Sequence, residues 1–185
     1  KDIFSHGQTG IWQYSVYAFV PSDAYGNGQT GPELSIQNTR SDGFGGYNTT
    51  TAGVQYIANV FWAEEYAKWK VWAETEEGDA GWITFTTEEI DLGTLYLLPL
   101  EADYFKNVYR SISVQGGSIK QSYDLSMFKI AEETKFTAES FVVTLESENL
   151  WNNCEPPSYN YPVYYDSLTL TQEVENIYLL LVIKP

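Results

Sequence analysis

The chain has 185 residues, 43% of them hydrophobic and 19% charged, which is the composition of a globular protein that buries a core without disulfides or metal. Its 25 acidic and 10 basic side chains give a formal net charge of −15. This charge repels nucleic acid and anionic lipid, so we expect neutral or cationic partners. No apolar run reaches the roughly 18 residues of a membrane span, so no membrane insertion is predicted.

The single cysteine, Cys154, excludes an internal disulfide and a cysteine zinc cluster. The chain begins with Lys1 and shows no apolar leader, so we expect a processed mature protein or an excised domain. Bacterial and archaeal extracellular proteins often lack disulfides, and a removed secretory signal would fit. We therefore expect an extracellular or cell-surface location.

Strand-like runs follow one another along the chain, each bounded by Gly, Asn, Asp or Pro. They are approximately Ile11–Val20, Glu33–Asn38, Val54–Trp62, Ala67–Thr75, Trp82–Thr87, Thr94–Leu98, Asn107–Gln115, Ser118–Leu125, Phe136–Glu146, Val163–Thr171 and Asn176–Ile183. Turn residues recur at short spacing, and no long helical pattern separates the runs. The pattern predicts an all-β fold, a single antiparallel β-sandwich over residues 1–185, of jelly-roll or immunoglobulin-like type, with about ten to eleven strands.

Three long segments with little hydrophobic character are predicted to be loops: Pro21–Pro32, Thr39–Gly53 and Leu150–Pro162. Binding sites are often built on such loops, and Tyr47 and Trp151 are their aromatic candidates. The alternative is that these segments only cap the ends of the sandwich.

The segment Val54–Thr75 is predicted to be a hairpin that turns at Glu64-Glu65. Alternation assigns to the core Tyr56, Ala58, Val60, Trp62, Ala67, Trp69, Val71 and Ala73. The opposite face holds Gln55, Ile57, Asn59, Phe61, Tyr66, Lys68, Lys70, Trp72 and Glu74. Flat aromatic rings among hydrogen-bonding groups suit sugars, which offer apolar C–H faces and a rim of hydroxyls.

A short helix over Ala63–Ala73 is the alternative for this segment. Trp62, Tyr66, Trp69 and Ala73 also fit a helical stripe, and Glu64 precedes Lys68 by four residues. A helix there would remove the aromatic surface and bury Trp69.

Two further hairpins and an apolar final strand are predicted. One hairpin turns at Gly116-Gly117 and opposes Val114 with Ile119, and the other turns through Gly78-Asp79-Ala80-Gly81. The run Ile177–Ile183 is apolar at both its odd and its even positions, so both faces of the strand would be apolar. This predicts a strand that is covered on both sides. Such a strand lies either in the middle of a sheet or against a neighbouring subunit.

No catalytic motif stands out, so we predict that the protein is not an enzyme. His6, the only histidine, lies in a Gly- and Ser-rich stretch with nothing resembling a nucleophile elbow nearby. No cation near Cys154 in the sequence would activate its thiol. Acidic pairs are plentiful, but the separation of two carboxyls across a cleft cannot be read from a sequence.

No cofactor is predicted from a defined motif. If the chain binds a metal, calcium is the one expected, because only hard oxygen ligands are abundant. The candidate ligands are Asp23, Asp42 and Asp79, together with loop carbonyls. EF-hand spacing is absent, and Asp is also an ordinary turn residue.

Two short segments resemble late strands of jelly-roll carbohydrate-binding modules. In those families a Trp opens a Thr-rich strand, as in Gly81–Thr87, and an Asp-containing strand closes the domain, as in Tyr165–Leu170. Here the two segments are widely separated and a further strand follows the second, so the chain is not assigned to such a family.

These observations predict a non-catalytic, extracellular carbohydrate-binding domain whose partner is a polysaccharide. Trp72, Phe61 and Tyr66 would stack on sugar rings, and Asn59, Lys70, Gln55 and Glu74 would bond to hydroxyls. The alternative is a structural subunit of an extracellular filament such as a pilus, a surface layer or a virion. In that case the exposed aromatics contact other copies of the chain, and a terminal strand pairs with a neighbour.

Overall fold

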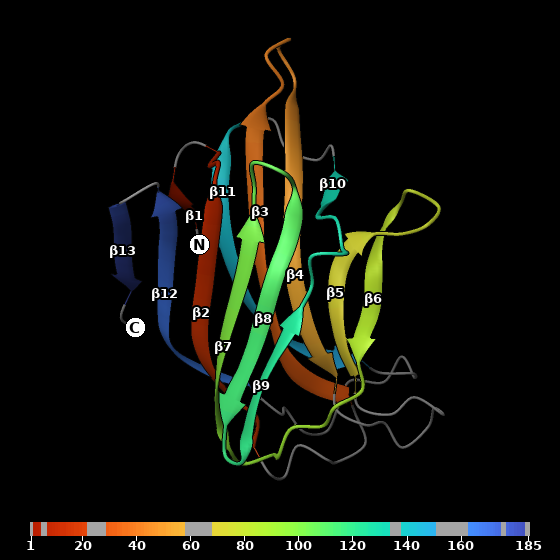
Figure 1. Cartoon of the computed structure of the whole chain (residues 1–185), viewed down its shortest axis with the longest axis vertical. Helices are drawn as coiled ribbons and strands as arrows, with labels where there is room; N and C mark the ends of the chain where they lie inside the picture. The colour runs from red at the N-terminus through yellow and green to blue at the C-terminus, as the bar shows by residue number, and fades with distance from the viewer. Residues whose placement is uncertain are drawn as a thin grey trace.

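The strands form two antiparallel sheets that pack face to face (Figure 1). The computed structural model of the chain describes residues 2–4, 7–21, 29–57, 68–133, 138–150, 163–174 and 177–183. Within these residues there are thirteen strands and no helix, which confirms the predicted antiparallel β-sandwich. Eleven strands have six residues or more, as the sequence predicted, and the remaining two have three residues each.

The first sheet has the strand order β1-β11-β3-β4-β5-β6, and β10 pairs with β4 beside β5. These strands are β1 (Asp2–Phe4), β3 (Gln29–Ser41), β4 (Tyr47–Ile57), β5 (Lys68–Glu74), β6 (Ala80–Thr86), β10 (Ala131–Glu133) and β11 (Ser140–Leu150). The second sheet has the order β13-β12-β2-β7-β8-β9. Its strands are β2 (Ile11–Phe19), β7 (Leu95–Asp103), β8 (Val108–Gly116), β9 (Ile119–Asp124), β12 (Tyr164–Val174) and β13 (Ile177–Ile183).

The core lies between the sheets and is rich in aromatic rings. Along β2, Trp12, Tyr14 and Val16 are buried while Gln13 and Tyr17 face solvent, as an alternating strand requires. From the first sheet, Tyr56 and Trp69 enter the core on neighbouring strands, with ring centroids 4.9 Å apart. Large rings from both sheets thus fill the space between them.

Tyrosine hydroxyls of the second sheet, and of the turn that follows β7, donate hydrogen bonds across the core to carbonyl oxygens of the first sheet. The donor and acceptor pairs are Tyr14 with Thr144 at 3.4 Å, Tyr104 with Ile36 at 3.4 Å, and Tyr109 with Trp72 at 2.6 Å. The Tyr109 hydroxyl also accepts from the Gly53 N–H at 2.7 Å. The hydroxyl of Tyr109 therefore links β4 to β5. It does so at the point along β4 where the pairing with β5 ends and the pairing with β10 begins.

The prediction of a loop over Thr39–Gly53 is wrong, because most of this segment belongs to a long hairpin formed by β3 and β4. Only residues 42–46 connect the two strands, and Figure 1 shows the hairpin projecting beyond the rest of the sheet. Its threonines are buried in place of apolar side chains, with Thr39 Oγ1 and Thr49 Oγ1 3.0 Å apart. Threonine is β-branched and can satisfy its hydroxyl across strands, so a polar sequence forms a strand here.

The predicted hairpin of β8 and β9 is present, but its register differs. Gly116 pairs with Ile119 and Val114 with Gln121, so the turn residues are Gly117 and Ser118. Gly117 has φ of 56°, a conformation that glycine adopts without steric cost. The shift is two residues, so Ile112 and Val114 remain buried. The bulge at Arg110 also buries Tyr109, which strict alternation with Ile112 would place outside.

The extended conformation predicted around Trp72 is confirmed where the structure describes it. Residues 54–57 lie in β4, Lys68–Glu74 form β5, and the two strands pair antiparallel. The helix alternative is therefore wrong over residues 68–73. The turn at Glu64-Glu65 lies outside the described residues.

The final strand does not lie in the middle of a sheet. Among the described strands, β13 pairs only with β12 and stands at the edge of the second sheet. An apolar sequence at a sheet edge is unusual, because edges offer unpaired backbone groups to other chains.

Candidate functional site

A groove of about 300 Å³ lies on the outer face of the first sheet. It is lined by Glu33, Ser35, Gln37, Thr51, Gly53, Trp72, Trp82, Glu133, Thr144 and Glu146. These residues alternate along their strands with core residues such as Leu34, Ile36 and Val54, so the groove faces away from the second sheet.

Two rows of cross-strand neighbours run over β11, β3, β4, β5 and β6 at the groove. The first row is Thr144, Ser35, Gly53, Trp72 and Trp82. The second row is Glu146, Glu33, Gln55, Lys70 and Thr84. All members of the first row line the groove, whereas of the second row only Glu146 and Glu33 do. Four strand spacings separate the first and last members of a row, or about 19 Å. The surface therefore has small residues and tryptophans in one row, and charged and amide groups in the next.

The floor of the groove is low because its residues are small. Gly53 sits beneath the rim of the Trp82 indole, and a Cβ added at Gly53 would lie 3.3 Å from Cη2 of that ring. It would also lie 3.3 Å from Cβ of Trp72. A larger residue at position 53 would have to displace the tryptophans, so the absence of a side chain there maintains the hollow.

Trp72 and Trp82 form an aromatic wall beside this floor. Their ring centroids are 5.3 Å apart with an interplanar angle of 68°, an edge-to-face contact, and both side chains are half-buried. The Trp72 Nε1–H and the Thr51 hydroxyl are buried and have no hydrogen-bond partner within the described part of the chain. Buried polar groups without partners are costly, so two of them lining one groove indicate a missing polar contact.

The polar side of the groove is dominated by carboxylates. The buried Gln55 side chain donates from Nε2 to Glu33 Oε2 at 3.1 Å and so holds that carboxylate in place. Glu146 lies directly opposite Glu33 on β11, and Glu133 of β10 is a third carboxylate in the lining. A neutral polar molecule would find acceptors here, and a cation would find an attractive potential.

The residues predicted to bind a ligand fall into three groups. Trp72 lines the groove, whereas Gln55 and Lys70 lie on the neighbouring row and do not line it. Glu74 on β5 forms an ion pair with Lys129 at 3.3 Å, and Tyr47 lies at the start of β4 beside the projecting turn. The remaining candidates, Phe61, Tyr66, Asn59 and Trp151, lie outside the described residues.

The calcium candidates are not brought together where the structure describes them. Asp42 Oδ1 accepts from the N–H groups of Phe44 and Gly46 at 2.8 and 2.9 Å, which fixes the β3–β4 turn. Asp79 lies in the exposed turn between β5 and β6. Asp23 lies outside the described residues, and no cluster of three or more His, Cys, Asp or Glu suited to a metal occurs within them.

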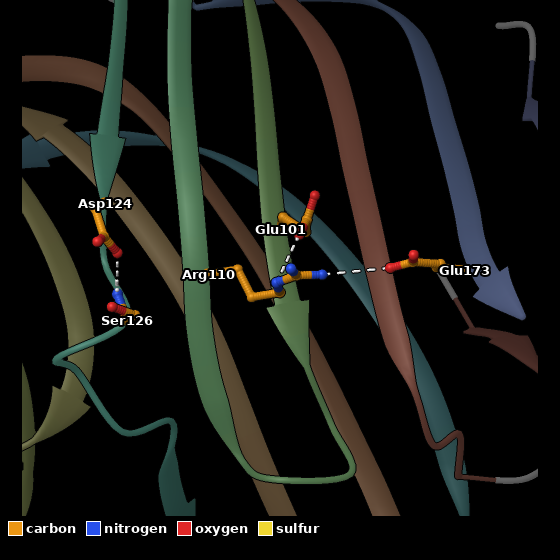
Figure 2. A network of polar contacts seen from close by, with 5 residues as sticks. All are labelled: Glu101, Arg110, Asp124, Ser126 and Glu173. Carbon is orange, nitrogen blue, oxygen red and sulfur yellow. Dashed lines mark hydrogen bonds and ion pairs between the residues drawn. The ribbon is translucent and has the colours of Figure 1, made fainter. Parts of the chain in front are cut away.

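A second hollow, of about 320 Å³, lies on the outer face of the second sheet and contains an internally paired arginine. Figure 2 shows Arg110 between two carboxylates, with Nε 3.0 Å from Glu101 and Nη1 3.3 Å from Glu173. Arg110 is the extra residue of a bulge in β8, which turns its side chain toward these partners. Nearby, the Ser126 N–H bonds to Asp124 and lowers the pKa of that carboxyl. These charges are satisfied within the chain, so this hollow is the weaker candidate.

An apolar patch occupies the opposite end of the same outer face. Tyr164, Phe19 and Leu95 are cross-strand neighbours on β12, β2 and β7, followed by Tyr17 and Leu97 in a parallel row. Tyr164 is 56% exposed and Leu95 is 50% exposed. A contiguous patch of this kind is a feature of surfaces that contact other proteins.

Comparison of the chain with protein-family models, with curated proteins and with solved structures finds no match. None of the described segments forms a helix long and apolar enough to cross a membrane. We therefore infer the function from the groove and its residues.

Sequence reasoning missed Trp82, Glu33 and Glu146 as members of this site. The alternation of Glu33 and Ser35 with Leu34 and Ile36 already indicated that the former face solvent. Glu33 lies opposite Glu146, and Ser35 opposite Thr144, only because β3 pairs with β11, and these two strands are far apart in the sequence. No local signal specifies that pairing.

Proposed function

We propose that this protein is a non-catalytic, extracellular carbohydrate-binding domain and that the groove of the first sheet is its binding site. The observation that carries the proposal is the edge-to-face pair of Trp72 and Trp82 beside a floor of small residues. A sugar ring could lie on this floor with its C–H face against an indole. The extracellular location is part of the same proposal and has no support beyond the expectation drawn from the sequence.

The polar surroundings support a sugar rather than an apolar ligand. Carboxylates and hydroxyls line the groove opposite the tryptophans, and sugar hydroxyls bond to both kinds of group. The unpartnered Thr51 hydroxyl and Trp72 Nε1–H offer further sites for a ligand hydroxyl or a bridging water.

Replacing Trp82 with Ala is expected to weaken glycan binding at least about tenfold, as removal of a central aromatic contact does. Gly53→Ala is expected to weaken binding too, because its Cβ would press on both tryptophans. A glycan array and an insoluble-polysaccharide pull-down identify the ligand, and titration calorimetry measures the change.

Phe105→Ala is the matched control, since Phe105 is 77% exposed in the turn between β7 and β8, away from the groove. Circular dichroism melts establish that each variant is folded. Equal glycan retention by the wild type, Trp82→Ala and Gly53→Ala would reject the groove as the binding site.

The alternative function, a structural subunit of an extracellular assembly, is favoured by different features. The apolar strand β13 stands at a sheet edge, and the patch around Tyr164 and Leu95 lies on the same sheet. Phe44 is 97% exposed at the tip of the projecting β3–β4 hairpin. Strand addition at β13 with aromatic contacts would cover these surfaces.

Sizing chromatography over a range of protein concentrations separates the two functions. A subunit of an assembly should elute as oligomers whose size falls when Tyr164→Ser and Leu95→Ser are introduced together. A carbohydrate-binding domain should elute as a monomer at every concentration and retain glycan.

A further inference from the structure

We propose that Thr51 determines the specificity of the groove: its hydroxyl, together with the Trp72 Nε1–H, binds a hydroxyl group of a neutral glycan. This inference rests on the proposed function and adds the chemical class of the ligand. It starts from the position of Thr51, which is 9% exposed and lines the groove. Its buried hydroxyl has no hydrogen-bond partner in the described residues.

A second polar group of the same kind lies beside Thr51. The Nε1–H of Trp72 is also buried and without a partner in the part of the chain that the structure describes. Trp72 lies directly opposite Gly53, and Thr51 precedes Gly53 by two residues on the same face of β4. Diagonal neighbours of this kind have Cα atoms about 7 to 8 Å apart, which is within reach of an aromatic side chain. This spacing allows one ligand group to contact both side chains.

The two groups together select the chemistry of the ligand atom. The indole N–H of Trp72 can only donate, whereas the hydroxyl of Thr51 can both donate and accept. A ligand hydroxyl accepts from Trp72 and donates to Thr51, so it satisfies both groups at once. An ammonium group has no acceptor and cannot bond to the indole N–H, so an amino substituent does not fit this position.

An anionic substituent is disfavoured for a different reason. A carboxylate or sulfate could accept from both groups, but no Lys, Arg or His is among the described residues that line the groove. A buried charge without a cationic partner is costly, and the formal net charge of −15 adds long-range repulsion. The hydroxyl of a neutral sugar is therefore the group that fits.

The missing partner of Thr51 also determines how this residue contributes to affinity. A buried hydroxyl without a partner costs free energy in the unliganded protein, and a ligand hydroxyl that supplies the partner removes this cost. Removal of the Thr51 hydroxyl should therefore weaken binding without lowering the stability of the protein. A threonine that only supports the fold would show the reverse.

Titration calorimetry with neutral and charged hexasaccharides tests the ligand class. The neutral hexamers are those of glucose, galactose, mannose and xylose, and the charged ones are those of glucosamine and galacturonate. Salt at about 0.5 M screens the long-range interaction of a charged ligand with the acidic chain. We expect at least one neutral hexamer to bind. The glucosamine hexamer should bind no more tightly than the glucose hexamer, and the galacturonate hexamer more weakly than the galactose hexamer.

Thr51→Val should weaken binding of the tightest neutral hexamer about tenfold, while the thermal unfolding midpoint should not fall. Thr51→Ser retains the hydroxyl and should retain most of the affinity. The matched control is Thr39→Val, because Thr39 is buried, its Oγ1 lies 3.0 Å from Thr49 Oγ1, and it does not line the groove. This control should lower the unfolding midpoint and leave binding unchanged.

Each contrary result has a distinct meaning. Equal binding by the wild type and Thr51→Val, with binding still lost in Trp82→Ala, would overturn the role of Thr51 and leave the carbohydrate-binding function standing. A lower unfolding midpoint in Thr51→Val would reveal a structural hydroxyl and overturn the inference too. Tighter binding of a charged hexamer than of its neutral counterpart would overturn the ligand class. No binding of any hexamer would overturn both proposals.

Discussion

Raising the pH above about 10, the usual pKa of tyrosine, is expected to unfold this protein over a narrow range. Burial raises the pKa of Tyr14, Tyr104, Tyr109 and Tyr165 above the ordinary value. Three of these, Tyr14, Tyr104 and Tyr109, have no measurable solvent exposure. Each must remain neutral in the folded protein, whereas the unfolded chain can release the proton.

The direction of the effect follows from proton binding. Below about pH 10 both states hold the tyrosine proton, so pH does not change the contribution of these groups to stability. Between that pH and the raised folded pKa the unfolded state holds fewer protons, and stability falls by about 1.4 kcal/mol per pH unit for each tyrosine. Three such groups lower the free energy of unfolding by about 4 kcal/mol per pH unit, against a typical total of about 5 to 15 kcal/mol.

Alkaline titration followed by far-ultraviolet circular dichroism and by tyrosinate absorbance checks this expectation. Part of the tyrosinate signal should appear together with the loss of strand structure, rather than before it. Tyr104→Phe should reduce the steepness of the transition, since one titrating group is removed. Complete tyrosine ionisation while the circular dichroism stays native would show that these hydroxyls are accessible in the folded state.

Tyr109→Phe is expected to lower the free energy of unfolding by about 1 to 3 kcal/mol, although it removes a single oxygen atom. The hydroxyl accepts from the Gly53 N–H at 2.7 Å and donates to the Trp72 carbonyl at 2.6 Å. Phenylalanine would leave both backbone groups buried without this partner. The cost is the desolvation of those groups rather than the energy of one hydrogen bond.

Chemical denaturation of the wild type and the variant measures the difference. Tyr17→Phe is the matched control, because Tyr17 is 37% exposed on the outer face of β2, and its change should stay within about 0.5 kcal/mol. Hydrogen exchange at Gly53 should accelerate in Tyr109→Phe, since its N–H loses an acceptor. If the two variants are equally stable, the hydroxyl of Tyr109 does not link the sheets energetically.

The fold class and the faces of the strands could be predicted from the sequence because both depend on local alternation. Trp69 and Trp72 were assigned to opposite faces, and the structure places Trp69 in the core and Trp72 on the outer surface. A register error of two residues in the β8–β9 hairpin left Ile112 and Val114 buried, whereas the bulge at Arg110 buried Tyr109 against the alternation. Periodicity therefore predicts which side a residue occupies without predicting its neighbours.

The groove could not be predicted, because it depends on pairings between distant segments. Glu33 and Glu146 meet only when β3 pairs with β11, and Trp82 covers Gly53 only when β6 follows β5 in the sheet. The Thr-rich part of the β3–β4 hairpin was mistaken for a loop because its strands bury hydroxyls instead of apolar groups. Cross-strand hydroxyl bonds leave no hydrophobic pattern in a sequence.

The floor of the groove is made of strand residues, and β3 and β4, which carry Ser35 and Gly53, are paired along both sides. Its outline is therefore fixed before any ligand arrives. Binding at this groove would need no ordering of the described strands that form its floor, which would avoid a substantial entropic penalty. Changing the size of Ser35 or Thr144 would alter the depth of the hollow without moving the backbone, so new specificities could arise on this scaffold one substitution at a time.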